Sequence, residues 1–233
     1  ARGCPTLRTA VIITTDKVYA NPETGRPFVE NDPLGGADPY SSSKACTEIL
    51  CAAYRQSYFA ARDLRLATAR AGNVFGGGDW AAQRLIPDLL AAFAAGQIAE
   101  LRRPEAVRPW QHVLAPLHGY LLLTEKLWQS QDFARGWNFG PEAEDCQPVA
   151  AVATQLAALW GDDARWQALP SDFPHEAGQL RLDASPARTR LAWQPRWSLA
   201  QGLAQTVRWQ RAWLAGADLA AVCLRQIAEY CDD

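Results

Sequence analysis

Tyr40 and Lys44, which stand four residues apart, carry the clearest chemical signal in the sequence. Residues at this spacing lie on the same face of an α-helix and can meet one ligand. A tyrosine with a pKa of about 10 is a poor base at neutral pH, but a neighbouring ammonium stabilises the phenolate. The pair predicts removal of a proton from a hydroxyl group, and the alternative is an exposed lysine one turn from a packed tyrosine.

The elements that position this pair are a strand, a loop and a helix. Residues 10–15 (AVIITT) form a β-branched apolar run, which predicts a strand buried on both faces in a parallel sheet. Ligands bind beyond the carboxyl ends of such strands, so Thr15, Asp16 and Lys17 fall where chemistry is expected. Residues 21–38 predict an irregular loop, and Asp38 with Pro39 predicts the start of a helix over residues 40–62.

The segment that follows completes a strand, helix and strand unit. Residues 64–71 predict the second strand, and the glycine-rich residues 72–78 predict a functional loop at its carboxyl end. That loop is not a dinucleotide fingerprint, because it follows the wrong strand, and we expect it to let the backbone approach the sugar nucleotide closely. Further downstream the patterns predict a short strand over residues 136–140 and helices over residues 84–96, 114–129, 149–160 and 199–214.

Thr15, Tyr40 and Lys44 together resemble the Ser/Thr, Tyr and Lys triad of the short-chain dehydrogenase/reductase superfamily. The resemblance implies that Tyr40 is the base and acid, and that Thr15 binds the reacting hydroxyl. It also implies that Lys44 holds the nicotinamide ribose of NAD and lowers the pKa of Tyr40. Ala71 is expected to belong to the same cofactor site.

Longer stretches resemble the nucleotide-sugar 4,6-dehydratases of this superfamily, and the CDP-glucose subgroup in particular. They are TTDKVY, DPLGGADPYSSSK, RAGNVFGGGDWAAQRLIPD, RPWQHVLAPLHGYL and HEAGQLRLDASPARTRLAW. Asp16 then matches the acid that protonates the departing C6 hydroxyl. Lys17 stands where many dTDP-glucose enzymes have Glu, and it either removes the C5 proton or pairs with a carboxylate or phosphate. Thr15 replaces the usual Ser of the subgroup and Val18 the usual Cys.

The substrate-binding residues follow from the same resemblance. Asn73 is expected to contact the diphosphate. Arg84 and Arg108 are expected to bind phosphate or nucleotide, because the planar cationic guanidinium group suits phosphate oxygens. For each arginine a surface ion pair is the alternative. His112 would orient a phosphate or the sugar, or pack as a structural histidine, and His175 would border the nucleotide site.

The implied architecture is α/β: the C-terminal part of a Rossmann-like doubly wound parallel sheet with a smaller, mostly helical lobe. Residues 1–78 would form the C-terminal part of the NAD-binding domain. Residues 79–233 would form the lobe that binds the nucleotide sugar, and this lobe would be interleaved with the sheet domain. The chain contains no Met and starts with Ala1. We therefore expect the sequence to begin inside a longer protein, whose missing front carries the glycine-rich pyrophosphate turn.

The implied reaction converts CDP-glucose to CDP-4-keto-6-deoxyglucose. The alternatives are a dTDP-glucose or GDP-mannose dehydratase, a UDP-sugar 4-epimerase and an inactive sugar-nucleotide-binding fragment.

A net charge of −2 gives no reason to expect nucleic acid or an anionic membrane as partner. The six cysteines lack metal-ligand spacing and no apolar run approaches a membrane span, so we expect no metal and a cytoplasmic protein. The resemblance implies a homodimer or homotetramer.

Overall fold

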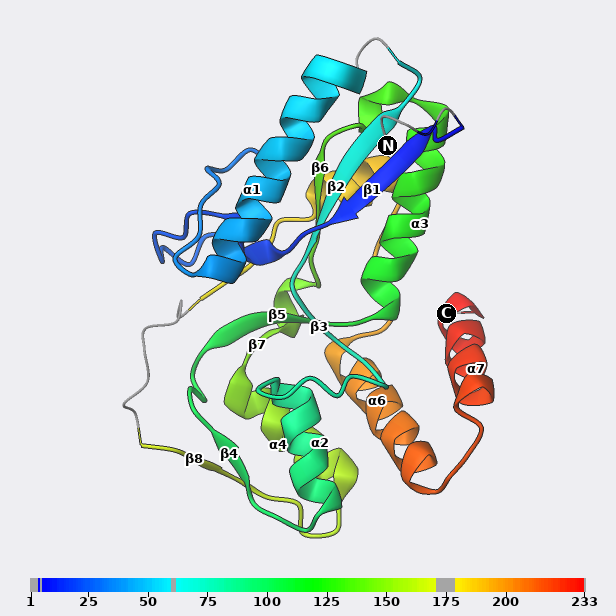
Figure 1. Ribbon diagram of the computed structural model, residues 1–233. Coiled ribbons are helices and arrows are strands. Elements are labelled where there is room, and N and C mark those ends of the chain that lie inside the picture. The colour runs from blue at the N-terminus through cyan, green and yellow to red at the C-terminus, as the bar shows by residue number, and fades with distance from the viewer. Residues whose placement is uncertain (1–3, 5, 60–61, 171–178, 233) are drawn as a thin grey trace. The chain divides into compact units, whose positions relative to one another are not determined.

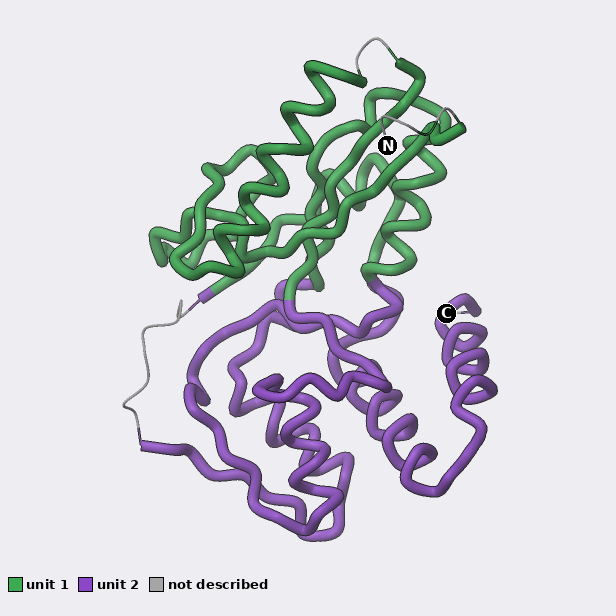
Figure 2. Tube along the Cα trace, viewed as in Figure 1, with its two compact units in different colours: residues 1–72, 116–141, 180–194 green, residues 73–115, 142–179, 195–233 purple. Residues whose placement is uncertain are grey.

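The computed structural model describes residues 4, 6–59, 62–170 and 179–232, and the chain forms two compact units (Figures 1 and 2). Unit 1 consists of residues 1–72, 116–141 and 180–194, and unit 2 of residues 73–115, 142–179 and 195–233. Each unit is therefore assembled from segments that lie far apart in the sequence. The predicted domain boundary after residue 78 stays a prediction. In the part of the chain that the structure describes, no helix is long and apolar enough to cross a membrane.

Unit 1 is built around a parallel sheet with strand order β1-β2-β6. In chain order its elements are β1 (Thr9–Ile13), η1 (Asp16–Val18), α1 (Pro39–Tyr54), the π-helical turn η2 (Arg55–Phe59), β2 (Arg65–Ala71), most of α3 (Leu114–Gln129), η3 (Gln131–Phe133), β6 (Gly136–Phe139) and α5 (Ser185–Leu191). The predicted strands and the predicted start of the first helix are confirmed. Asp38 caps α1 by accepting a hydrogen bond from the Ser41 N–H at 3.0 Å.

The two faces of this sheet differ in chemistry, because successive residues of a strand point to opposite sides. Trp137 and Phe139 of β6 are fully buried, and the Phe139 ring meets Trp193 edge-on beside α3 and α5. Thr68, Arg70 and Asn138 are equally buried but polar. They share a face with α1, which lies along the opposite side of the strands from α3 (Figure 1).

One prediction about β1 is wrong. The strand is not buried on both faces, because Ile12 and Ile13 are 37% and 43% exposed. The reason is its place in the sheet: β1 lies at an edge of the order β1-β2-β6, so the described residues supply a neighbouring strand on one side only.

Unit 2 packs helices around one apolar core. Its elements are β3 (Asn73–Phe75), α2 (Leu85–Ala94), β4 (Ala99–Leu101), β5 (Val107–His112), η4 (Ala143–Asp145), β7 (Cys146–Pro148), α4 (Val149–Trp160), β8 (Trp166–Ala168), α6 (Leu199–Leu214) and α7 (Leu219–Asp232). The core includes Leu89, Leu156 and Leu203, contributed by α2, α4 and α6 respectively. The prediction of a continuous loop over residues 72–78 is wrong, since Asn73 to Phe75 pair in parallel with Trp110 to His112.

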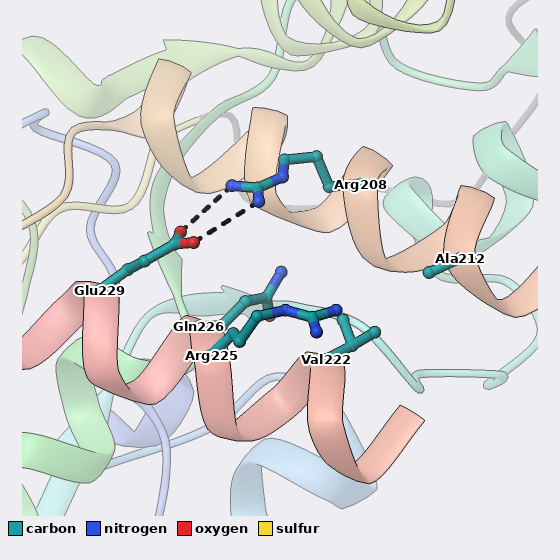
Figure 3. Close-up of a pocket in the computed structure, with 6 residues that line it drawn as sticks. All are labelled: Arg208, Ala212, Val222, Arg225, Gln226 and Glu229. Atoms are coloured by element: carbon teal, nitrogen blue, oxygen red, sulfur yellow. Dashed lines mark hydrogen bonds and ion pairs between the residues drawn. The ribbon is translucent and has the colours of Figure 1, made fainter. Parts of the chain in front are cut away.

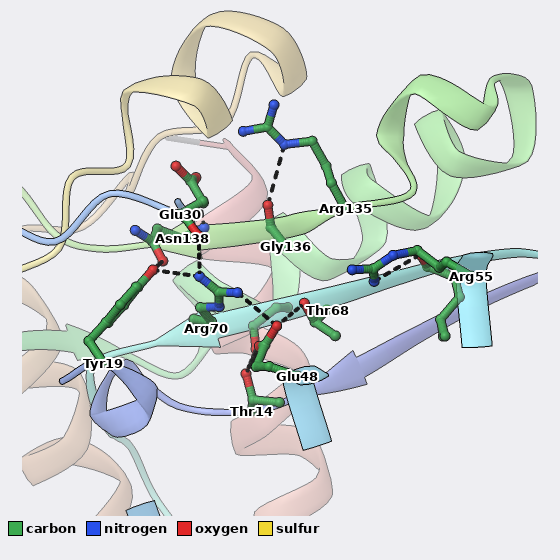
Figure 4. A network of polar contacts seen from close by, with 12 residues as sticks. Thr14, Tyr19, Glu30, Glu48, Arg55, Thr68, Arg70, Arg135, Gly136 and Asn138 are labelled. Carbon is green, nitrogen blue, oxygen red and sulfur yellow. Dashed lines mark hydrogen bonds and ion pairs between the residues drawn. The ribbon is translucent and has the colours of Figure 1, made fainter. Parts of the chain in front are cut away.

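Arg70 and Glu48 form a buried ion pair at the polar face of the unit 1 sheet (Figure 4). Arg70 Nη2 lies 2.8 Å from Glu48 Oε2, and the two side chains are 5% and 2% exposed. Arg70 Nη1 also donates to Tyr19 Oη at 2.8 Å, and Tyr19 donates to Asn138 Oδ1 at 2.6 Å. Gly136 leaves room for the guanidinium, because a Cβ there would lie 2.7 Å from Arg70 Nη2.

These contacts decide the charge of each group. Burial favours neutral Glu48, but its bonds to Arg70, Thr14 and Thr68 outweigh burial and hold its pKa below the ordinary value of 4.5. Burial likewise disfavours charged Arg70, but Glu48 and Tyr19 keep its pKa above the ordinary value. Burial raises the pKa of Tyr19 to about 12, so its hydroxyl stays protonated and donates.

Arg70→Met should remove the partner of Glu48 and leave a buried carboxylate. The expected loss in the free energy of unfolding at pH 7 is about 3–5 kcal/mol. In the wild type the depressed pKa of Glu48 stabilises the fold above pH 4.5, and that contribution disappears as the pH falls below it. Without Arg70, burial instead raises the pKa of Glu48, and stability is lost as the pH rises. The difference in the free energy of unfolding between wild type and variant should therefore decrease as the pH is lowered. Urea denaturation at several pH values measures this difference.

Arg26→Met is the matched control, because Arg26 pairs with Asp32 at 2.9 Å while its own side chain is 56% exposed. Solvent screens this exposed guanidinium, so the stability of this variant should remain close to that of the wild type. A loss for Arg70→Met that is the same at pH 5 and pH 8 would contradict the assignment of a charged Glu48.

Candidate active site

The carboxyl end of β1 presents Thr15 and Asp16 as a hydrogen-bonded pair. Both residues are buried, at 7% and 3% exposure. Thr15 Oγ1 donates to Asp16 Oδ1 at 3.0 Å and accepts from the Lys17 N–H at 3.4 Å, which caps the short helix η1. A hydroxyl group and a carboxyl group thus lie side by side at the carboxyl end of the strand, which is where parallel sheets bind ligands.

Tyr40 and Lys44 lie on the first two turns of α1, and the structure brings the lysine to the same strand end. Lys44 Nζ donates to the carbonyl of Ile13, the last residue of β1, at 3.4 Å. It also lies 6.0 Å from the centre of the Tyr40 ring. Tyr40 is half exposed, so its hydroxyl is open to a ligand. The predicted triad and Asp16 are therefore all held in unit 1, with an ammonium beside a phenol.

Lys17 is exposed and lies near the start of α1. The Ser41 hydroxyl and the Ser41 backbone N–H lower the pKa of Asp38, and the charge of Lys17 adds to this effect. Asp38 is therefore a specific carboxylate with which Lys17 interacts, as one of the two alternatives for Lys17 requires. Ala71 ends β2 as a small buried side chain in the same unit.

The predicted substrate residues that the structure describes lie in unit 2. Asn73 begins β3 and Arg84 is an exposed residue that precedes α2. Arg108 is 9% exposed on β5, and its Nη1 donates to the carbonyl of Val107 at 2.9 Å. His175 lies outside the described residues, so its predicted role stays a prediction.

His112 ends β5 in an apolar setting. Its ring lies 6.0 Å from the Phe75 ring and 5.0 Å from the Trp197 ring, between ring centres, and burial lowers its pKa to about 4. Nδ1 accepts the Leu114 N–H at 3.4 Å, so the neutral ring carries its proton on Nε2. Within the described residues Nε2 has no hydrogen-bond partner, and it lies below Gly76.

Glu48 and Arg70 are site-supporting residues that sequence reasoning missed. The sequence contains two signals: Glu48 follows Lys44 by one turn of α1, and Arg70 lies between two alanines inside the strand RLATARA. A charged residue inside such a strand indicates a buried partner. Which partner it finds depends on the tertiary structure.

The glycine-rich segment after β3 is held against α6. A Cβ at Gly77 would lie 2.2 Å from the indole of Trp209, so only glycine fits there. Trp80 extends the cluster, with its ring centre 4.5 Å from that of Trp213 and 5.9 Å from that of Trp209. A cavity of about 240 Å³ borders this segment, lined by Val74, Phe75, Gly76, Gly77, Asp79 and Val113.

A smaller cavity of about 70 Å³ lies between α6 and α7 (Figure 3). Arg208 and Glu229 border it and form an ion pair at 3.1 Å, and Arg225 lies beside them. None of the predicted site residues lines this cavity, so it receives no role in the site.

The chain matches known sequences along nearly its whole length. The profile of the NAD dependent epimerase/dehydratase family matches residues 2–133. A CDP-glucose 4,6-dehydratase of Salmonella typhimurium is 44% identical over 230 residues, which cover 96% of this chain and 64% of that protein. A dTDP-glucose 4,6-dehydratase of Xanthomonas campestris is 28% identical over 212 residues, 88% of this chain and 59% of that protein.

Solved structures share the fold. The dTDP-glucose 4,6-dehydratase of Bacillus anthracis, in complex with NAD, superposes with a TM-score of 0.75 at 25% identity, over 86% of this chain and 61% of its own. The UDP-glucuronic acid 4-epimerase of Bacillus cereus gives a TM-score of 0.78 at 19% identity, over 91% and 64%. The prediction of a Rossmann-like α/β fold is confirmed. The chain spans less than two thirds of the length of each of these relatives.

Gly77→Ala should destabilise unit 2 by about 1–3 kcal/mol, because the new methyl group would overlap the indole of Trp209. Trp209→Leu in the same protein should relieve part of that cost, and a double-mutant cycle in urea would measure a coupling of about 1 kcal/mol or more. Gly96→Ala is the comparison for backbone strain without overlap, since Gly96 has a φ of +64° and no atom lies within 4 Å of its added methyl group, so Trp209→Leu should not relieve its cost. Additive effects of Gly77→Ala and Trp209→Leu would refute the contact.

Proposed function

The chain belongs to the NAD dependent epimerase/dehydratase family, and we propose that its site performs the 4,6-dehydration of CDP-glucose to CDP-4-keto-6-deoxyglucose. The observation that carries the proposal is the buried Asp16 that accepts a hydrogen bond from Thr15. An enzyme that only epimerises C4 needs no acid beside its tyrosine, whereas loss of water does. The 44% identity to the Salmonella enzyme supports CDP-glucose over other nucleotide sugars.

The first half of the reaction oxidises C4 of the hexose. Tyr40 takes the proton of the C4 hydroxyl, and Thr15 holds the C4 oxygen in place through its own hydroxyl. Lys44 Nζ lies 6.0 Å from the centre of the tyrosine ring, which places a cation beside the group that accepts the proton. The product is a 4-keto sugar with an acidic proton on C5.

The second half expels water. Asp16 gives a proton to the C6 hydroxyl as it leaves, and Lys17 takes the proton from C5, so a double bond forms between C5 and C6. Tyr40 returns its proton to C5 as the 4-keto-6-deoxy product is completed, and the proton that Lys17 took from C5 passes through solvent to Asp16, which gave one to the leaving water. Each protein group therefore ends the cycle in its starting protonation state.

The residues at the strand end fit the nicotinamide and ribose of NAD, which supplies a reversible two-electron acceptor for the sugar. Lys44 Nζ has three N–H groups, and its contacts with described residues use one of them, on Ile13. The remaining two suit ribose hydroxyls. Ala71 offers a small side chain that lets a flat ring approach.

Unit 2 supplies the groups for the nucleotide sugar. Asn73, Arg84 and Arg108 carry the amide and guanidinium donors that bind phosphate oxygens. His112 adds a neutral Nε2–H donor with no protein acceptor among the described residues. The family resemblance further supports assembly as a homodimer or homotetramer. Free thiols at Cys46 and Cys51 support a reducing compartment such as the cytoplasm.

The proposal is tested by offering CDP-, dTDP- and UDP-glucose and GDP-mannose in turn to the protein expressed from its complete reading frame. We expect a 4-keto sugar, detected by its absorbance in alkali, with CDP-glucose as the best substrate by kcat/KM. Product from none of the four would refute the dehydratase assignment, and product from dTDP-glucose alone would refute the choice of CDP.

Asp16→Asn should permit oxidation at C4 and block the loss of water, because an amide cannot protonate the leaving hydroxyl. In a single turnover we expect the absorbance of reduced nicotinamide to accumulate, while 6-deoxy product falls by about 100-fold or more. Tyr40→Phe is the comparison, since it should abolish both signals. Normal product formation by Asp16→Asn would remove Asp16 from the mechanism.

A further inference from the structure

Building on the proposed function, we infer that Glu48 is a positioning residue, which locks the helix that carries Tyr40 and Lys44 to the strand end that carries Thr15. The contact that fixes the helix is the hydrogen bond that Thr14 Oγ1 donates to Glu48 Oε1 at 2.5 Å. Thr14 immediately precedes Thr15, so the hydrogen bond anchors the backbone next to the residue that holds the reacting hydroxyl.

The geometry of α1 makes Glu48 suited to this role. Tyr40, Lys44 and Glu48 are spaced at i, i+4 and i+8, so they lie along one stripe of the helix. The stripe contacts the end of β1 at two points: Lys44 Nζ donates to the Ile13 carbonyl at 3.4 Å, and Glu48 accepts from Thr14. The exposed lysine contact is long, whereas the glutamate contact is short and fully buried. Glu48 therefore fixes the distance from helix to strand more firmly than Lys44 does.

The rest of the network holds the carboxylate itself in place (Figure 4). Glu48 Oε2 accepts from Thr68 Oγ1 at 2.6 Å and from Arg70 Nη2 at 2.8 Å. Thr68 and Arg70 both belong to β2, so the second oxygen is tied to the central strand of the sheet. One carboxylate thereby joins α1, β1 and β2, and its Oε1 is left with a single orientation toward Thr14.

A loss of this hydrogen bond should affect the chemical step more than substrate binding. Small displacements of reacting groups reduce rate strongly, because proton transfer needs the donor and acceptor at hydrogen-bond distance. The predicted nucleotide-binding residues Asn73, Arg84 and Arg108 belong to unit 2, whereas Glu48 and Thr14 belong to unit 1. The expected signature is a lower kcat with little change in KM.

Two threonines provide a matched test, because each gives one hydroxyl to Glu48. Thr14→Val removes the hydrogen bond next to Thr15, and Thr68→Val removes the one on β2. We expect both variants to lower Tm by a similar amount. Thr14→Val should lower kcat about 10-fold or more with KM nearly unchanged, whereas Thr68→Val should stay within about threefold of wild type. Thr14→Ser, which keeps the hydroxyl, should restore kcat to within about threefold.

Equal losses of kcat in Thr14→Val and Thr68→Val, or an unchanged kcat in Thr14→Val, would overturn the inference. The wild-type substrate panel is measured first, so failure of the proposed function is seen separately as an inactive wild type. In that case amide hydrogen exchange decides the inference without substrate. Thr14→Val should accelerate exchange in residues 15–18 several-fold relative to Thr68→Val, and equal exchange in the two variants would overturn it.

Discussion

The buried ion pair between Glu48 and Arg70 is the interaction on which unit 1 depends. Two charges with 2% and 5% exposed side chains are costly to bury, and they are tolerated because every oxygen of the carboxylate has a donor. The pair also dictates its surroundings. Tyr19 and Asn138 complete the polar chain around the guanidinium, and glycine occupies position 136 because a side chain would displace it.

This arrangement explains why one face of the unit 1 sheet contains buried polar groups. A sheet face covered by a helix normally buries apolar side chains, as Trp137 and Phe139 do on the α3 side. On the α1 side, Leu66 packs with Cys51 and Tyr54, but Thr68, Arg70 and Asn138 are buried there as well. An apolar contact would allow α1 to slide along the strands, whereas directional hydrogen bonds to one carboxylate define a single register.

Unit 2 follows a different principle, in which aromatic packing shapes the loops. Gly77 packs so closely against the indole of Trp209 that no side chain would fit at position 77. The ring of Trp80 packs against Trp209 of the same helix, α6. Aromatic packing thereby holds Gly77 of the glycine-rich segment against α6. Nearby, His112 is kept neutral by burial, with its proton on Nε2.

The sequence by itself determined the local features that short-range physics controls. The spacing of Tyr40 and Lys44, the Asp38 cap and the apolar periodicity of α3, α4 and α6 predicted helices that the structure contains. It also determined the parallel strands β1 and β2, whose composition is typical of α/β sheets. The resemblance of whole motifs to a known family identified the candidate residues of the site.

Only the tertiary structure decided the long-range pairings. Glu48 and Arg70 are 22 residues apart on different elements, and no periodicity links them. Strands β4 and β8, three residues each, are too short to show alternation and exist because they pair with one another. Exposure of Ile12 and Ile13, like the burial of His112, likewise depends on which elements cover them. Sequence patterns report on neighbours along the chain, whereas burial and charge pairing are set by neighbours in space.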